Sequence, residues 1–141
     1  MIKIEISRDQ VDRLLKRYGS KLRNLEKPLT GFGNYFVSET EKQFVTETDP
    51  DENRWADLAP STLAEKRRLG YPDDILTRTG KMRKSVNAIA TSKALAIKIQ
   101  SEYAIYHQEG TSKMPQRKIL GMNDKRRERL AKLIRVYLKL K

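Results

Sequence analysis

Two short runs with alternating apolar residues, "SVNAIAT" and "ALAIKIQ", lie on either side of the dipeptide "SK". A two-residue apolar period is typical of a strand with one buried face, so the pair predicts an antiparallel hairpin over about 86–100. Ile2, Ile4 and Ile6 alternate with charged residues in the same way and predict another short strand.

The clearest helical period lies at the end of the chain. Leu130, Leu133, Ile134 and Tyr137 follow the spacing i, i+3, i+4, i+7, which predicts an amphipathic helix over about 123–139. The same segment is rich in lysine and arginine and holds only two acidic residues, Asp124 and Glu128. Its basic face is interpreted either as the solvated side of a packed helix or as a surface turned toward phosphates.

Other segments also show helical spacing or helix-start signals. Ser7 and Gln10 form a capping box that begins a helix. Pro28 marks the break at which this helix has ended. Helices are predicted in the segments 7–25, 29–47, 60–69 and 80–85. The expected fold is α+β: a small antiparallel sheet flanked by helices, with long N-terminal helices and the basic C-terminal helix, in one domain of residues 1–141.

Composition limits the class of protein. The chain has 141 residues and carries 30 Lys+Arg against 18 Asp+Glu, a net charge of +12, which suits nucleic acid, another polyanion or an acidic protein surface as a partner. It contains no cysteine, so disulfides, thiolate metal sites and cysteine nucleophiles are excluded. No apolar run approaches the roughly 20 residues that span a bilayer, and a soluble, non-secreted protein without membrane contact is expected.

Candidate catalytic and ligand motifs are incomplete. "DPDENR" begins like a calcium loop, but Arg54 stands at its sixth position and Pro60 at its twelfth. Gly80 and Lys81 resemble part of a phosphate loop, yet the glycine that should precede them and the hydroxyl residue that should follow are missing. A nuclease would need converging carboxylates, and the acids are spread along the chain. No catalytic residue, metal or cofactor is expected.

The only histidine, His107, lies in "YAIYHQEGTSKMPQRKIL" (103–120). A lone histidine cannot build a histidine-rich metal site, and no neighbouring residue has the spacing of a nucleophile or orienting partner. We expect His107 to form a hydrogen bond that fixes the turn before Gly110 and Thr111, where glycine permits a positive φ. The segment is then interpreted as a turn followed by an extended stretch that contacts another subunit.

Trp55 and Leu58 are the only large apolar residues in the polar stretch "TETDPDENRWADLAPST". Two roles stay open for Trp55. It either pins the loop to its own subunit or serves as an interface anchor, a role in which tryptophan is enriched.

An ordered series of motifs resembles the phage virion morphogenesis (tail completion) family of tailed, mainly contractile-tailed, bacteriophages. The series comprises Phe44, "RWADL", Ser61-Thr62 with Lys66, "ILTRTGKMRKSV", "YAIYHQEGT" and "MPQRKILG". One departure is Lys118, where the family usually has proline. The resemblance implies a structural virion protein without enzymatic activity, placed at the head–tail junction. It also implies a small α+β fold and a ring, six- or twelve-fold, around the channel through which DNA leaves.

The resemblance implies other copies of the chain, tail tube or terminator proteins and head–tail connector proteins as partners, with transient contact to double-stranded DNA. The protein would assemble in the host cytoplasm and reside in the virion neck. The alternative is a non-specific nucleic-acid-binding protein that uses the basic C-terminal helix. Candidate subunit or partner contacts are Arg54, Trp55, Leu58, Tyr103, His107, Gly110, Thr111, Met114, Pro115, Arg117, Ile119 and Leu120. Candidate contacts to DNA or an acidic partner are Arg78, Lys81, Arg83, Lys84, Lys125, Arg126, Arg127 and Arg129.

Overall fold

The structure is a computed structural model that describes residues 2–5, 13, 16 and 19–139. Its sheet has three antiparallel strands, β1 (Ile2–Glu5), β2 (Val86–Ala90) and β3 (Leu95–Ile99), in the order β1-β3-β2. A turn closed by the Thr91 amide, which donates to the Ala94 carbonyl at 2.8 Å, joins β2 to β3. The predicted hairpin and the predicted N-terminal strand are both confirmed.

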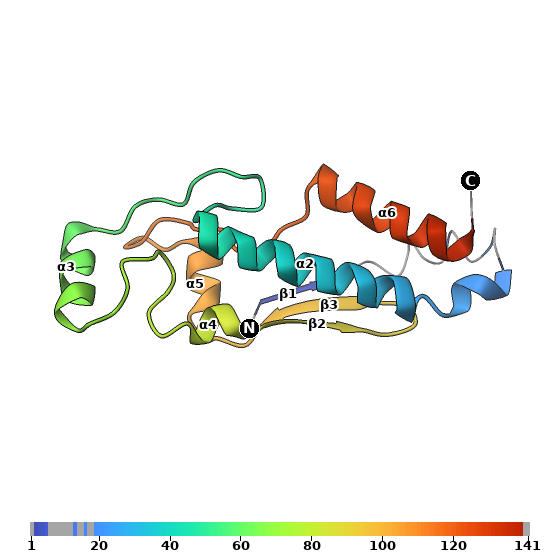
Figure 1. The fold of residues 1–141 in the computed structure, drawn as a ribbon, viewed down its shortest axis with the longest axis horizontal. Coiled ribbons are helices and arrows are strands. Elements are labelled where there is room, and N and C mark those ends of the chain that lie inside the picture. Colours follow the sequence, from blue (N-terminus) through green and yellow to red (C-terminus); the bar gives the residue numbers. More distant parts are fainter. Residues whose placement is uncertain (1, 6–12, 14–15, 17–18, 140–141) are drawn as a thin grey trace.

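The longest helix, α2 (Glu26–Thr46), covers one face of this sheet, as Figure 1 shows. It buries Leu29, Phe32, Phe36 and Phe44 in the core. A Cβ on Gly33 would lie 2.8 Å from the Cβ of Ala88, so glycine permits the close approach of helix and strand.

The predicted helix over 29–47 is confirmed, but it begins earlier than expected. Pro28 lies in its first turn rather than at a break between helices. The amides of the first turn have no partner within the helix, so a proline there costs no hydrogen bond. The predicted helix over 7–25 falls largely outside the described residues. Its end is a short 3₁₀ helix, η1 (Gly19–Arg23), in which Leu22 is buried.

The C-terminal helix, α6 (Asp124–Leu138), confirms the strongest helical pattern of the sequence. It packs against α2, and Figure 1 shows α6 and the sheet on opposite sides of that helix. The side chain of Asn123 accepts a hydrogen bond from the Arg126 amide at 2.8 Å and so caps the first turn.

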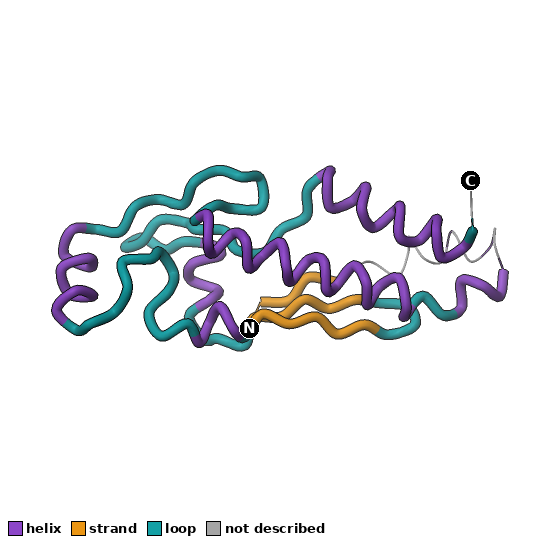
Figure 2. Tube along the Cα trace, viewed as in Figure 1, coloured by secondary structure: helices purple, strands orange, loops and turns teal. Residues whose placement is uncertain are grey.

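Three short helices complete the chain: α3 (Pro60–Arg68), α4 (Lys81–Lys84) and α5 (Ala104–Glu109). The first two confirm the helices predicted near 60–69 and 80–85. Figure 2 shows that long loops join α2, α3 and α4, and that α3 lies at one end of an elongated molecule. We call residues 56–80, which form this end, the arm.

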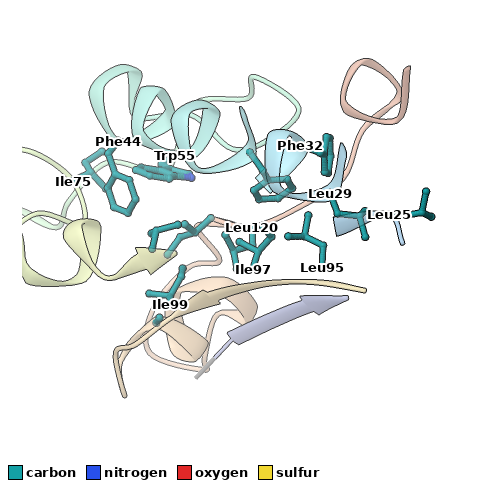
Figure 3. Packing of buried hydrophobic residues seen from close by; sticks show 14 of the residues in the cluster. Leu25, Leu29, Phe32, Phe44, Trp55, Ile75, Leu95, Ile97, Ile99 and Leu120 are labelled. Atoms are coloured by element: carbon teal, nitrogen blue, oxygen red, sulfur yellow. The ribbon is translucent and has the colours of Figure 1, made fainter. Parts of the chain in front are cut away.

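The core is made by residues that lie far apart in the sequence (Figure 3). Leu95, Ile97 and Ile99 of β3 are fully buried, as are Ile119 and Leu120 from the loop before α6. Burying a side chain of this kind stabilises the fold by about 1.5–3 kcal/mol. The fold is α+β, as the sequence predicts.

Candidate functional site

The segment 117–121, directly before α6, is held by side chains from other elements. Gln43 of α2 donates from Nε2 to the Ile119 carbonyl at 2.8 Å. Arg126 of α6 donates to the Gly121 carbonyl at 2.6 Å and to Oε1 of Gln43 at 2.5 Å. The Arg126 guanidinium also lies 4.6 Å from the centre of the Phe36 ring. Because these groups are buried, each polar atom needs its partner inside the protein.

A glutamine on α5 fastens the same segment from the other side. Oε1 of Gln108 accepts hydrogen bonds from the amides of Ile119 and Leu120 at 2.9 and 3.0 Å. Its Nε2 donates to the Leu120 carbonyl at 2.7 Å. Gln108 thus supplies the hydrogen bonds that a neighbouring strand would otherwise make to these main-chain groups in the core.

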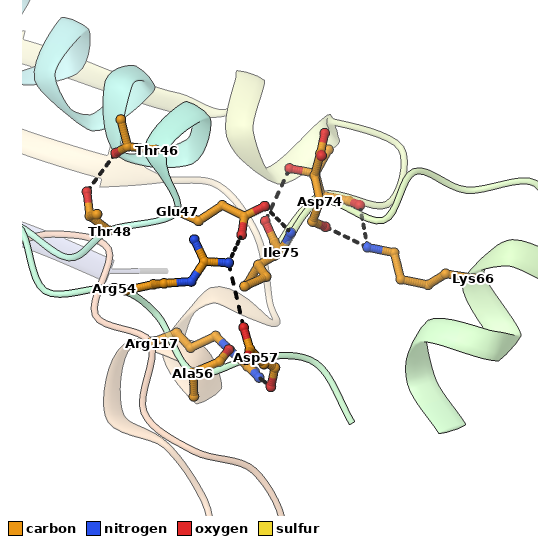
Figure 4. A network of polar contacts seen from close by, with 11 residues as sticks. Thr46, Glu47, Thr48, Arg54, Ala56, Asp57, Lys66, Asp74, Ile75 and Arg117 are labelled. Carbon is orange, nitrogen blue, oxygen red and sulfur yellow. Dashed lines mark hydrogen bonds and ion pairs between the residues drawn. The ribbon is translucent and has the colours of Figure 1, made fainter. Parts of the chain in front are cut away.

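Three further long-range hydrogen bonds join this segment to the loop after α2. The indole N–H of Trp55 donates to the Lys118 carbonyl at 2.9 Å. Arg117 donates to the carbonyls of Ala56 and Asp57 at 2.8 and 2.9 Å, as Figure 4 shows. Trp55 also packs edge-on against Phe44, with ring centroids 5.5 Å apart.

These contacts correct several of the interface predictions. Trp55, Ile119 and Leu120 are between 0% and 3% exposed, and Arg117 is 6% exposed, so their side chains offer almost no surface to a partner. Of the two roles open for Trp55, the structure shows the one within its own subunit. Within the predicted contact segment 114–120, the side chains of Arg117, Ile119 and Leu120 are therefore not available to another subunit, because they close the core of their own chain. The apolar residues Ile119 and Leu120 belong to the hydrophobic core.

The other interface candidates lie at the surface or near it. Arg54, Tyr103, Thr111 and Pro115 are exposed, while Leu58 and Met114 are half-buried. Tyr103 directly precedes α5, and Thr111 and Met114 face each other across the turn that follows this helix. The structure therefore brings Thr111, Met114 and Pro115 together but places Arg54 and Leu58 on a separate loop.

Gly110 has the positive φ predicted for it, +75°, and ends α5. A Cβ at this position would lie 2.9 Å from the amide nitrogen of Gln116, so a larger residue would force the chain apart. The predicted side-chain hydrogen bond of His107 is not what holds this turn. Nδ1 of His107 is buried without a partner among the described residues, and it is the His107 carbonyl that accepts, from the Arg117 amide at 2.7 Å.

We expect His107 to make the fold sensitive to mild acid. Burial, with a smaller effect of the Arg117 guanidinium, lowers the pKa of His107 below its ordinary value of 6.5. The unfolded chain then takes up the proton first, so the stability is complete above that value and is lost as the pH falls toward the folded-state pKa. Urea unfolding at about pH 7.5 and about pH 5.5 should show that the wild type loses unfolding free energy at the lower pH. The loss should be smaller in His107→Gln. An equal loss in both proteins would show that other groups cause it.

Polar contacts of side chains with main-chain groups hold the arm together and join it to α2 (Figure 4). Lys66 of α3 donates from Nζ to the carbonyls of Asp74 and Thr77 at 2.6 and 2.9 Å, and burial lowers the pKa of this amine. Glu47, at the end of α2, accepts from the Ile75 amide and from Arg54, each at 3.3 Å. Side chains thus supply bonds that a loop without strands cannot make for itself.

The cations predicted to contact DNA or an acidic partner fall into two separate groups. Arg78, Lys81, Arg83 and Lys84 belong to the end of the arm and to α4, which lies on the other side of α2 from α6 in Figure 1. Arg83 pairs with Glu41, and Arg78 lies 4.7 Å from the centre of the Tyr71 ring. In this group, Lys81 and Lys84 are exposed and have no acidic partner among the residues that the structure describes.

The second group lies on α6. Arg126 is only 3% exposed and must be removed from the predicted set, because its guanidinium is used inside the fold. Arg127 pairs with Asp124 at 3.1 Å, and Arg129 lies 5.1 Å from the centre of the Tyr35 ring. The exposed cations of the outer face of α6 are Lys125, Arg127, Arg129, Lys132 and Arg135.

Sequence reasoning did not single out several residues that the structure brings forward. Gln43 and Gln108 organise the loop before α6, and no spacing marks a glutamine that bonds to a distant main chain. Apolar side chains also remain at the surface, with Tyr106 52% and Ile89 50% exposed. Ile89 alternates with the buried residues of β2, so the two-residue period alone places it on the outer face.

The first acidic residue of the rejected calcium motif holds its own loop. In the described part of the chain, no group of three or more acidic or histidine residues is placed to hold a metal ion. Asp49, the first residue of the rejected calcium motif, instead accepts hydrogen bonds from the amides of Asp51 and Asn53, each at 2.9 Å. None of the helices in this part is long and apolar enough to cross a membrane.

The architecture is that of a small α+β protein whose arm and basic helix are presented at its surface. The model of the phage virion morphogenesis family matches residues 6–139, and the chain belongs to this family. It is therefore a virion-associated protein with a structural role in the phage, where it interacts with other virion proteins. Neither a curated protein sequence nor a solved structure gives a significant match.

Proposed function

We propose that this protein acts at the head–tail junction as a neck or tail-completion protein, without catalysis. Copies of the chain would form a six- or twelve-fold ring that joins the tail to the head connector and surrounds the DNA exit channel. The resemblance of the motif series to tail-completion proteins motivates this placement, and family membership supports the structural role. Assembly would take place in the host cytoplasm before the virion is released.

The observation that carries the proposal is the exposed cationic face of α6 on a chain that completes its own core. Lys125, Lys132 and Arg135 point away from the packed side of the helix and have no acidic partner among the described residues. Such a face suits acidic surfaces of neighbouring virion proteins and brief contact with DNA phosphates. A channel through which DNA must leave should not hold it tightly, so protein docking is the main use we propose for these cations.

Binding to arbitrary duplex DNA tests the proposal against a free nucleic-acid-binding protein. At about 150 mM salt we expect a dissociation constant of about 10 µM or weaker, in the range of purely electrostatic contact. The double variant Lys132→Glu/Arg135→Glu should abolish incorporation into virions, scored by complementing a phage that lacks the gene. The matched control, Lys132→Arg/Arg135→Lys, keeps both positive charges and should preserve incorporation. Submicromolar DNA binding by the monomer, with incorporation unaffected by charge reversal, would favour the alternative.

A further inference from the structure

The outer edge of the sheet is open at β2. In the order β1-β3-β2, this strand pairs on one side only within the described part of the chain, and Figure 2 shows it as the outermost strand at the lower edge of the molecule. An unpaired edge offers a row of amide and carbonyl groups to another strand. Proteins commonly block such edges with charged residues, proline or a bulge. The five residues of β2, "VNAIA", contain no charge and no proline, and pair with β3 without a bulge.

The pairing register shows which groups face outward. The Thr91 amide donates to the Ala94 carbonyl, which makes that pair hydrogen-bonded. Because such pairs alternate along an antiparallel ladder, Asn87 and Ile89 direct their amides and carbonyls toward β3. The main-chain groups of Val86, Ala88 and Ala90 then point away from the sheet. None of these three residues has an outward hydrogen bond to the rest of the described chain.

From this edge we infer that β2 pairs antiparallel with β2 of a second copy of the chain, extending the sheet across the two subunits. Centring the contact on Ala88 places Ala88 opposite its counterpart and Val86 opposite Ala90. All three outward-facing residues then form hydrogen-bonded pairs, whereas any shift of the register leaves some of them without partners.

The side chains of β2 fit this self-pairing. The strand is uncharged, so two copies meet without like charges across the contact. Asn87 of one copy comes opposite Ile89 of the other, on the face of the sheet away from α2, and Ile89 is 50% exposed in the single chain. A contact of this kind is two-fold and makes pairs of copies. The inferred β2–β2 pairing goes beyond the proposed head–tail role and does not depend on the proposed ring.

Cysteine cross-linking tests the pairing directly, since the chain has no cysteine of its own. A mixture of the single variants Asn87→Cys and Ile89→Cys, carrying different tags, should form a disulfide-linked heterodimer under mild oxidation. Opposed residues at such a non-hydrogen-bonded position have Cα atoms about 4.5 Å apart, within the range of a disulfide. Each variant alone should cross-link poorly, because like positions lie about 7–8 Å apart on the diagonal. No heterodimer, or equal yields from the variants alone, would overturn the inference.

A charge at the edge gives a second, independent measurement. Ile89→Lys should weaken self-association in sedimentation velocity by about tenfold, because the lost cross-strand contact occurs twice in the pair. Val45→Lys, at a position 67% exposed on α2, is the matched control and should leave association unchanged. Both variants should melt like the wild type. Equal self-association of Ile89→Lys and wild type would also contradict the pairing, while leaving the head–tail proposal standing.

Discussion

Arg126→Ala is expected to lower the melting temperature by about 10 °C. The change deprives the Gly121 carbonyl and Oε1 of Gln43 of their donor and leaves both acceptors buried. Each unsatisfied buried acceptor costs about 1–3 kcal/mol, and the contact with the Phe36 ring is lost as well. Thermal unfolding followed by circular dichroism measures the effect.

The neighbouring variant Arg127→Ala is the matched control. Arg127 is exposed and pairs with Asp124, which is more exposed still, so the melting temperature of this variant should match that of the wild type. Gln43→Ala should also destabilise, and the double variant Gln43→Ala/Arg126→Ala should lose less than the two single losses together, because the residues share one bond. If Arg126→Ala and Arg127→Ala both melted like the wild type, Arg126 would be a surface cation after all.

Trp55→Ala is expected to cost about 3–5 kcal/mol of unfolding free energy. Trp55 is 3% exposed, packs against Phe44 and donates to the Lys118 carbonyl, so the variant leaves a cavity and an unpaired carbonyl. Trp55→Phe keeps an aromatic ring in the core but loses the bond, and should cost about 1–2 kcal/mol. Urea unfolding curves would measure both differences.

Tyr103→Ala serves as the aromatic control, because this side chain is 69% exposed and its loss should leave stability unchanged. The comparison separates the two roles that the sequence left open for Trp55. A stable Trp55→Ala protein that fails to enter virions would show an interface anchor, contrary to the buried position. An unstable protein, with Tyr103→Ala stable, would show the core role.

Elements with a strong local period could be predicted from the sequence. The alternation around "SK" gives β2 and β3, and the apolar spacing from Leu130 to Leu138 gives α6. Pro28 misled the prediction because proline breaks a helix interior but fits a first turn, and the sequence does not show which of the two applies. Leu22 and Leu25 are buried as their spacing suggests, although most of the helix predicted there lies outside the described residues.

The candidate site was less predictable because it depends on contacts between distant residues. Arg117 and Arg126 look like surface cations in a basic sequence, yet each donates to carbonyls that the fold brings alongside. In the sequence, Ile119 and Leu120 look like part of an exposed apolar segment. In the fold they are buried, and Gln108 of α5 satisfies their amides. Local patterns give the type of a side chain, whereas its burial depends on which segments meet in three dimensions.

Cryo-electron microscopy of the intact virion tests the central claim most directly. The account predicts a ring of density between the portal-proximal connector and the tail, into which copies of α2, α6 and the three-stranded sheet fit, with α6 against acidic protein surface or the DNA channel. Finding this fold in the capsid shell, the tail tube or the baseplate, or finding no copy of it in the virion, would contradict the head–tail placement.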